Sequence, residues 1–120
     1  MPCLVVTPGE PTGIGPDVLL QAVALGKFEP IVAIADINLM RERAALLGAK
    51  IKCIEVQESD LASLTNQVDE LAVLHVPLAT TCVPGQLDKA NAPYVIATLD
   101  KAISLCQQNL ASAMVTGPVH

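Results

Sequence analysis

The sequence predicts an α/β fold with a mostly parallel sheet flanked by helices. Short apolar runs rich in β-branched residues alternate with segments of helical periodicity, as parallel α/β folds require. Two of these runs, residues 4–7 and 31–35, read as strands buried on both faces. The core must be aliphatic, because 52% of the residues are hydrophobic and only 2% are aromatic. We expect one domain at most, since the chain has 120 residues.

The predicted elements follow in order along the chain. They are a strand at 4–7, a helix from Pro16 to Gly26, a strand at 31–35, a helix from Asp36 to Gly48, a half-exposed strand at 51–56, a surface excursion at 57–70, a strand at 71–76, a turn at 84–87, a helix from Asp88 to about Asn109 and a buried strand at 113–116.

Helix signals in the first half are local. Pro16 suits the first turn of a helix, because its missing N–H costs nothing there, and Gly26 is a C-terminal stop. Asp36 is a capping residue directly after a strand, and Gly48 follows the last helical residues. Two strand–helix units are therefore expected before residue 50.

The second half is less regular. Residues 51–56 alternate between apolar and polar side chains, and residues 57–70 are mostly polar. Pro77 ends the strand that precedes it. Asp88 is a capping residue, and Pro93 is either tolerated near the first turns of this long helix or marks a late start.

Charge and hydropathy exclude two classes of partner. The formal net charge is −5 and the seven basic residues form no cluster, which argues against nucleic acid. No stretch approaches the roughly 18 to 20 apolar residues of a membrane span. The first residues lack the basic region of a secretory signal, so we expect a cytoplasmic location.

The mean hydropathy of +0.50 is high for a free-standing domain of this size. It favours a subunit of an oligomer or a piece of a larger protein. The chain also stops in a Gly-Pro loop after a strand, where the ligand site of an open α/β sheet is built. We therefore expect residues 1–120 to be one segment of a longer protein.

Metal-binding spacing is absent from the cysteines and histidines. There is no CxxC motif, and His75 and His120 complete no zinc pattern. In a cytoplasmic chain the thiols stay reduced and behave as small buried apolar residues. His75 is expected to be structural, and no nucleophile is assigned. The four cysteines are Cys3, Cys53, Cys82 and Cys106.

The first candidate site is the loop at 7–17. Gly9, Gly13 and Gly15 allow close backbone approach to a ligand, and amides at the helix start can face an anion. A rigid strand-to-helix turn explains the same residues equally well. Glu10 is a candidate catalytic carboxylate, a partner for a cation or a solvated side chain.

The second candidate site is the segment 116–120. A threonine hydroxyl at Thr116 and an imidazole at His120 can bind a phosphate or assist proton transfer, with Gly117 between them. The alternative is a chain terminus with an exposed histidine.

Together the two segments resemble the 4-hydroxythreonine-4-phosphate dehydrogenase family of pyridoxal 5′-phosphate biosynthesis. Residues 7–16 match its opening Thr-Pro-Gly-Glu-Pro-x-Gly-Ile-Gly-Pro, with Thr12 where the family commonly has a small residue. Residues 116–120 match its Thr-Gly-Pro-Val-His, which a lysine normally follows. The resemblance covers the whole chain in order.

The resemblance implies a fold similar to isopropylmalate dehydrogenase, with two α/β domains and a cleft between them. This chain would supply the amino-terminal α/β segment. It further implies a homodimer with a shared active site, a phosphorylated small-molecule substrate and NAD or NADP as cofactor. A divalent metal (Zn, Mg or Co) would polarise the reacting oxygens during oxidation and decarboxylation.

Few functional residues carry over from the family. Its three metal-binding histidines lie beyond the last residue here, so no metal ligand and no secure catalytic residue is expected in this segment, and the chain alone should be inactive. The residues that match a loop lining the cleft are Gly9, Glu10, Gly13 and Gly15. The residues that match a loop near the substrate are Thr116, Gly117 and His120.

Two alternatives remain open. The first is a dehydrogenase of the same fold that acts on phosphothreonate or phosphoerythronate. The second is a non-enzymatic binding or regulatory domain that is complete at 120 residues.

Overall fold

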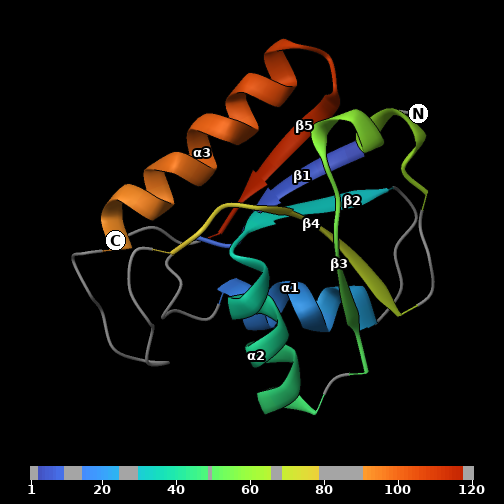
Figure 1. The fold of residues 1–120 in the computed structure, drawn as a ribbon, viewed down its shortest axis with the longest axis vertical. Coiled ribbons are helices and arrows are strands. Elements are labelled where there is room, and N and C mark those ends of the chain that lie inside the picture. Colours follow the sequence, from blue (N-terminus) through green and yellow to red (C-terminus); the bar gives the residue numbers. More distant parts are fainter. Residues whose placement is uncertain are drawn as a thin grey trace.

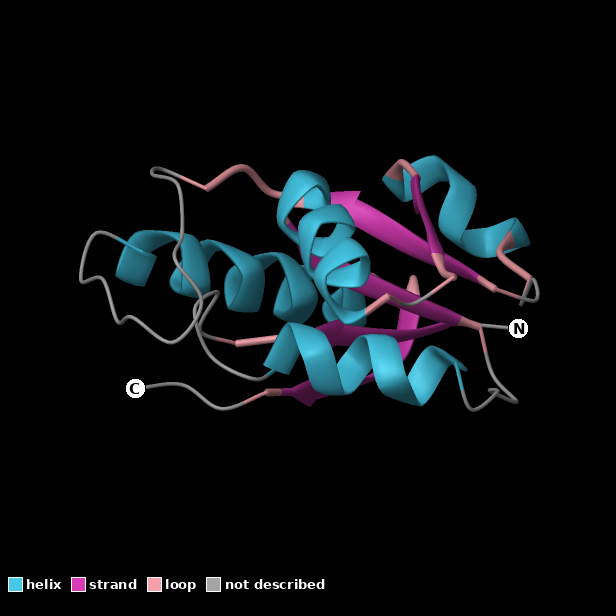
Figure 2. Cartoon of the chain, turned by 90° about the horizontal axis from the view of Figure 1, so that it is seen from below, coloured by secondary structure: helices cyan, strands magenta, loops and turns pink. Residues whose placement is uncertain are grey.

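The computed structural model describes residues 3–9, 15–24, 30–48, 50–65, 69–78 and 91–117. Within them, one five-stranded parallel sheet is flanked by helices (Figures 1 and 2), which confirms the predicted fold class. The elements are β1 (Cys3–Thr7), α1 (Gly15–Ala24), β2 (Ile31–Ala35), α2 (Ile37–Leu47), β3 (Lys52–Glu55), the 3-10 helix η1 (Glu58–Ser63), β4 (Glu70–His75), α3 (Ala92–Gln107) and β5 (Ala111–Thr116).

The strand order is β3-β4-β2-β1-β5, and every neighbouring pair is parallel. Helices α1 and α2 pack on one face of the sheet, and α3 and η1 pack on the other. Figure 1 shows α3 on one side of the strands and α1 with α2 on the opposite side. The chain therefore changes face between β2, which α2 follows, and β4, which α3 follows.

Each face has its own aliphatic core, as the composition predicts. The buried residues of the α1–α2 face are Leu19, Leu20, Ala33, Ala35, Ile37, Met40, Ala44, Cys53, Leu71 and Val73. Those of the α3 face are Cys3, Val5, Val32, Ile34, Leu61, Leu74, Ala102, Leu105 and Ala111.

Helix α2 has both predicted ends. The Asp36 carboxylate accepts hydrogen bonds from the backbone N–H groups of Asn38 and Leu39, which otherwise have no intrahelical partner. Gly48 closes the helix in a left-handed conformation with φ 67°. The expected stop at Gly26 and the turn at 84–87 lie outside the described residues.

Helix α3 starts later than Asp88. Its first residue is Ala92, Asn91 takes the N-cap position, and Pro93 stands in the first turn. A proline fits there because the first amides of a helix have no intrahelical acceptor. Of the two readings of Pro93, the late start is correct; Asp88 itself lies outside the described residues.

Two further expectations need correction. Strand β5 was expected to be buried, yet among its residues only Ala111 is buried, and Val115 is 52% exposed. In the described structure β5 pairs with β1 alone, so it is an edge strand. Residues 57–70 are more than a surface excursion, because η1 inserts Leu61 fully into the core.

Strand β3 is half-exposed, as predicted. Cys53 is buried, while Lys52 and Ile54 are exposed. Cys3 and Cys53 are free, buried thiols, and Cys106 is a half-buried free thiol; Cys82 lies outside the described residues. None of the described helices is long and apolar enough to cross a membrane.

Candidate functional site at the carboxyl edge of the sheet

All five strands are parallel, so their carboxyl ends meet at one edge of the sheet. Ligands of open α/β sheets bind at this edge, typically where neighbouring strands send their connections to opposite faces. Two places along this edge are candidates for a ligand site. One is the boundary between β2 and β4, and the other is the pair β1 and β5, which carries both motifs singled out in the sequence.

The boundary between β2 and β4 is occupied by the protein's own groups. The N–H of Ile37 donates to His75 Nδ1 at 3.1 Å. The N–H groups of Asn38 and Leu39 donate to Asp36 Oδ1 at 2.8 and 3.3 Å. The first amides of α2, which bind phosphate in many dinucleotide-binding folds, are therefore already used.

The same network continues to the other face of the sheet. Asp36 Oδ2 accepts from the N–H of Leu78 at 2.8 Å, and the N–H of Asp36 donates to Tyr94 Oη at 2.9 Å. Asp36 is only 8% exposed. It thus ties the end of β2 to the start of α2, to the residues after β4 and to α3, which is a structural role.

His75 takes part in this network in the manner of a structural histidine. Its Nδ1 accepts a backbone hydrogen bond, so a neutral ring carries its proton on Nε2. The structural reading made from the sequence agrees with this geometry.

At β1 and β5 the two predicted loops meet. Thr7 pairs in register with Thr116, and the N–H of Gly117 donates to the carbonyl oxygen of Thr7 at 2.7 Å. A Cβ atom added to Gly15 or to Gly117 would overlap the carbonyl oxygen of Pro8. The start of α1 and the end of β5 therefore converge on one peptide group, and each needs glycine for that approach.

Gly9 lies next to this contact and has φ 86°, a left-handed conformation that favours glycine. Four of the sequence-predicted residues are thus brought together at the carboxyl ends of β1 and β5: Gly9, Gly15, Thr116 and Gly117. The remaining candidates, Glu10, Gly13 and His120, lie outside the described residues.

Sequence reasoning gave no separate role to the two polar residues at the ends of this loop. Thr7, its first residue, is 1% exposed, and within the described part of the chain its Oγ1 has no hydrogen-bond partner. Asp17, its last residue, binds Arg43 Nη1 through Oδ2 at 2.8 Å, while its buried Oδ1 has no partner among the described residues. The available signal was a hydroxyl closing an otherwise apolar strand and a carboxylate in the first turn of a helix.

Two of the described cysteines, Cys3 and Cys53, lie away from this site. Burial raises the pKa of the Cys3 thiol, which opens β1 and so lies toward the opposite edge of the sheet. Burial also raises the pKa of the Cys53 thiol in the edge strand β3. Both shifts disfavour the nucleophilic thiolate. Among the described residues, no three His, Cys, Asp or Glu side chains are grouped as a metal site requires.

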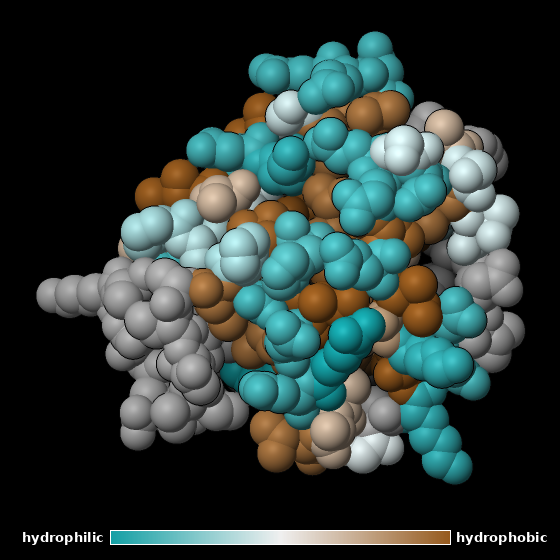
Figure 3. All heavy atoms as spheres, viewed as in Figure 1, coloured by the Kyte–Doolittle hydropathy of each residue, from teal (hydrophilic) through white to brown (hydrophobic). Residues whose placement is uncertain are grey.

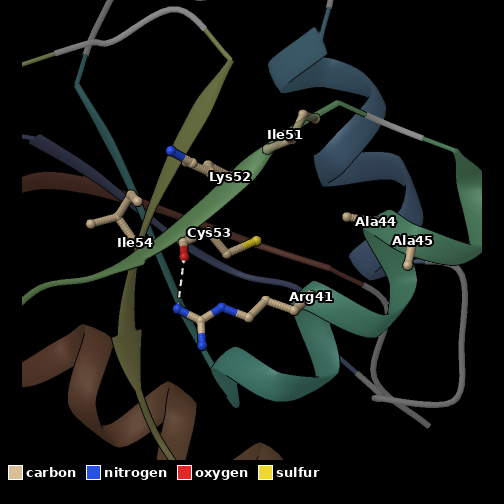
Figure 4. Close-up of a pocket in the computed structure, with 7 residues that line it drawn as sticks. All are labelled: Arg41, Ala44, Ala45, Ile51, Lys52, Cys53 and Ile54. Atoms are coloured by element: carbon tan, nitrogen blue, oxygen red, sulfur yellow. Dashed lines mark hydrogen bonds between the residues drawn. The ribbon is translucent and has the colours of Figure 1, made fainter.

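An open hollow of about 420 Å³ lies between α2 and β3, away from the two motifs. Figure 4 shows the Arg41 side chain reaching across to β3, where Nη2 donates to the carbonyl oxygen of Cys53 at 3.1 Å. This bond covers a backbone acceptor of an edge strand, a structural use of arginine. The lining residues are Arg41, Ala44, Ala45, Ile51, Lys52, Cys53 and Ile54.

Known proteins similar to this chain belong to one family. A family model described as pyridoxal phosphate biosynthetic protein PdxA matches residues 27–120. The chain is 46% identical over 119 residues to the 4-hydroxythreonine-4-phosphate dehydrogenase of Chromobacterium violaceum, covering 99% of the chain and 35% of that protein. It is 43% identical over 115 residues to the enzyme of the same name from Pseudomonas putida, covering 96% of the chain and 35% of that protein.

Solved structures share the fold. The 4-hydroxythreonine-4-phosphate dehydrogenases of Klebsiella pneumoniae and Burkholderia phymatum both superpose with a TM-score of 0.88, at 21% and 18% identity. The match covers the whole chain and 38% and 37% of those proteins. The chain thus spans 35% of the length of these two curated relatives, or about a third. The family match and the identity to these relatives show that the chain belongs to the PdxA family of pyridoxal phosphate biosynthetic proteins.

Proposed function

We propose that this chain is the amino-terminal part of an NAD- or NADP-dependent 4-hydroxythreonine-4-phosphate dehydrogenase. The whole enzyme would oxidise and decarboxylate 4-phosphooxy-L-threonine in vitamin B6 biosynthesis. Curated relatives with this name support the proposal, as they are 43–46% identical to the chain. The observation that carries it is the meeting of the two family motifs at the Pro8 carbonyl.

In this proposal the segment forms one wall of the substrate cleft. The register of β1 and β5 sets Thr116 beside Thr7, and the contact with Pro8 sets the position of the glycine loop. Because these groups are held by the sheet, they are ordered before a ligand arrives, which lowers the cost of binding.

The described residues do not form a complete site for either cofactor. No metal-ligand group is present among them, and the first amides of α2 are bound by Asp36 and His75. Following the family resemblance, we assign the divalent metal (Zn, Mg or Co) and the main dinucleotide contacts to residues outside this segment. The nicotinamide would accept the hydride, and the metal would polarise the reacting oxygens.

The proposal includes a cytoplasmic homodimer, in which the active site draws on both subunits. Analytical ultracentrifugation of the full-length polypeptide is expected to show a dimer.

The decisive experiment uses the full-length polypeptide that carries this segment. It would be supplied with 4-phosphooxy-L-threonine, a divalent metal and either NAD or NADP, and formation of the reduced nicotinamide would be followed by absorbance. We expect turnover with this substrate. Turnover of phosphothreonate or phosphoerythronate instead would replace the substrate assignment, and no turnover of any of the three would contradict the proposed function.

A further inference from the structure

Thr7 is the last residue of β1, at the carboxyl edge of the sheet. The residue is 1% exposed, and within the described part of the chain its Oγ1 has no hydrogen-bond partner. A buried hydroxyl without a partner is unfavourable for folding, because it has lost its hydrogen bonds to water. The position therefore carries a hydroxyl group that the described part of the fold leaves without a hydrogen bond.

Thr98 provides an internal comparison. It is equally buried, at 2% exposure, but its Oγ1 donates to the carbonyl oxygen of Val95 at 2.7 Å. The fold can thus satisfy a buried threonine when it needs one. At Thr7, a valine of the same shape would match the preceding residues Val5 and Val6 and leave no polar atom unpaired.

The surroundings of Thr7 suit an anionic ligand. Residues paired in register point to the same face of a parallel sheet, so Thr7 shares its face with the exposed Thr116 and, two residues away, with Val5 of the α3-side core. The start of α3 lies at the same edge, since Tyr94 in its first turn bonds to Asp36 at the end of β2. The amino terminus of a helix of 16 residues favours negative charge nearby.

The main chain at this place has little freedom to move. Gly15 and Gly117 both press against Pro8, the residue after Thr7, and the Thr7 carbonyl is held by the N–H of Gly117. The position of the Thr7 side chain relative to β5 is therefore fixed by its backbone.

We propose that Thr7 is a ligand-binding residue. Its hydroxyl donates a hydrogen bond to a phosphoryl oxygen of a substrate held at the carboxyl ends of β1 and β5, beside Thr116. The identity of the ligand as a phosphorylated substrate rests on the proposed function, whereas the unpartnered hydroxyl does not. Thr7 is not among the residues that the family resemblance assigned to the cleft.

The test compares Thr7→Val, Thr7→Ser and Thr98→Val in the full-length polypeptide. Stability without ligand would be measured by chemical denaturation. Affinity would be measured for inorganic phosphate by thermal shift, and for 4-phosphooxy-L-threonine through kcat and KM.

Thr7→Val should be at least as stable as the wild type and should bind phosphate about 10- to 100-fold more weakly, the effect of losing one hydrogen bond to a charged group. Thr7→Ser, which keeps the hydroxyl, should bind nearly as the wild type does. Thr98→Val should lose stability and keep its affinity for phosphate.

Two results would overturn the inference. One is a wild type that does not bind phosphate, or a Thr7→Val variant that binds phosphate as tightly as the wild type does. The other is a Thr7→Val variant that loses stability which Thr7→Ser restores, because the hydroxyl would then be bonded within the fold. If the wild type binds phosphate through Thr7 but does not turn over 4-phosphooxy-L-threonine, the proposed function is wrong, whereas the assignment of Thr7 as a ligand-binding residue holds.

Discussion

Pro8 explains why two distant positions are glycine. Its carbonyl oxygen occupies the space that a Cβ atom of Gly15 or Gly117 would need, although these residues are 102 positions apart in the chain. The sequence marks both as glycines in motifs, but only the tertiary contact shows that they serve the same peptide group. A substitution of Gly117 therefore tests whether the contact with Pro8 matters for the candidate site.

We expect Gly117→Ala to lower the free energy of unfolding by about 1–3 kcal/mol, because the added atom meets rigid backbone rather than a movable side chain. It should also weaken binding of phosphate by the full-length polypeptide. Denaturant titration and thermal shift measure the two effects.

Gly48→Ala is the matched control. It also places a side chain where strain is expected, since Gly48 has φ +67°, but nothing lies within 4 Å of its added Cβ. It should cost about 1 kcal/mol and leave phosphate binding unchanged. Equal effects of the two variants on binding would show that the Pro8 contact has no part in the site.

At the scale of elements, the start of α2 shows how a helix end is closed without a ligand. Ile37 is bonded by a histidine from β4, and the next amides by the Asp36 cap. From the sequence alone this histidine, His75, is expected to be structural, and its hydrogen bond to Ile37 gives that role a measurable consequence.

His75→Leu removes the acceptor of the Ile37 N–H and should reduce the free energy of unfolding by about 1–3 kcal/mol. His75→Asn offers an oxygen near the position of Nδ1 and should lose less than half as much. Denaturant unfolding measures the free energy of unfolding of both variants. Equal reductions in the two would mean that the hydrogen bond to Ile37 contributes nothing to stability. Turnover by the full-length His75→Asn polypeptide should stay near the wild-type value.

Within the described part of the chain, a buried and an exposed ion pair each connect two elements. Arg43 Nη1 and Asp17 Oδ2 join α2 to α1 at 2.8 Å, with side-chain exposures of 5% and 27%. Lys101 Nζ and Glu58 Oε1 join α3 to η1 at 3.0 Å, with exposures of 40% and 43%. Burial makes the first pair the one whose disruption matters.

Arg43→Met should therefore cost about 2–3 kcal/mol, somewhat below the loss for a fully buried pair because water still reaches Asp17. Lys101→Met should cost at most about 1 kcal/mol, as exposed pairs do. Both values come from chemical denaturation at one ionic strength. Similar losses in the two variants would show that burial of the Arg43 pair is not what makes it important.

At the scale of the whole molecule, the described surface has apolar residues on several elements. The exposed large hydrophobic side chains are Leu46, Leu47, Ile54, Ile96, Ile103 and Val115. On the face seen in Figure 3, brown apolar areas are separated by teal hydrophilic ones rather than merged into one patch. The edge strand β5 combines an exposed Val115 with an unpaired outer side among the described residues.

The chain of 120 residues, tested alone, should produce no reduced nicotinamide from 4-phosphooxy-L-threonine. Its described residues hold no metal-ligand group, and the chain spans 35% of the length of its relatives. The control is the full-length polypeptide at the same concentration with the same metal. Measurable turnover by the 120-residue chain would contradict this expectation.

Much of the fold was predictable because its signals are local. Asp36 and Gly48 mark the ends of α2 through bonds to residues within four positions, and the apolar run 31–35 is a strand with the expected bounds. Predictions failed where burial depends on distant neighbours. The apolar residues of β5 look like a buried strand, yet Val115 is exposed because of where β5 lies in the sheet.

The sequence by itself determined the α/β class, the caps of α2 and the two motifs that carry the family resemblance, because each depends on residues close together in the chain. Only the tertiary structure showed that the β2–β4 boundary at the carboxyl edge is filled by the protein's own hydrogen bonds. The bonds that fill the β2–β4 boundary join Asp36 to Tyr94 and Ile37 to His75, across 58 and 38 positions. That the Thr7 hydroxyl has no partner among the described residues is likewise a property of packing, since a threonine in a sequence does not reveal whether its oxygen will find a partner.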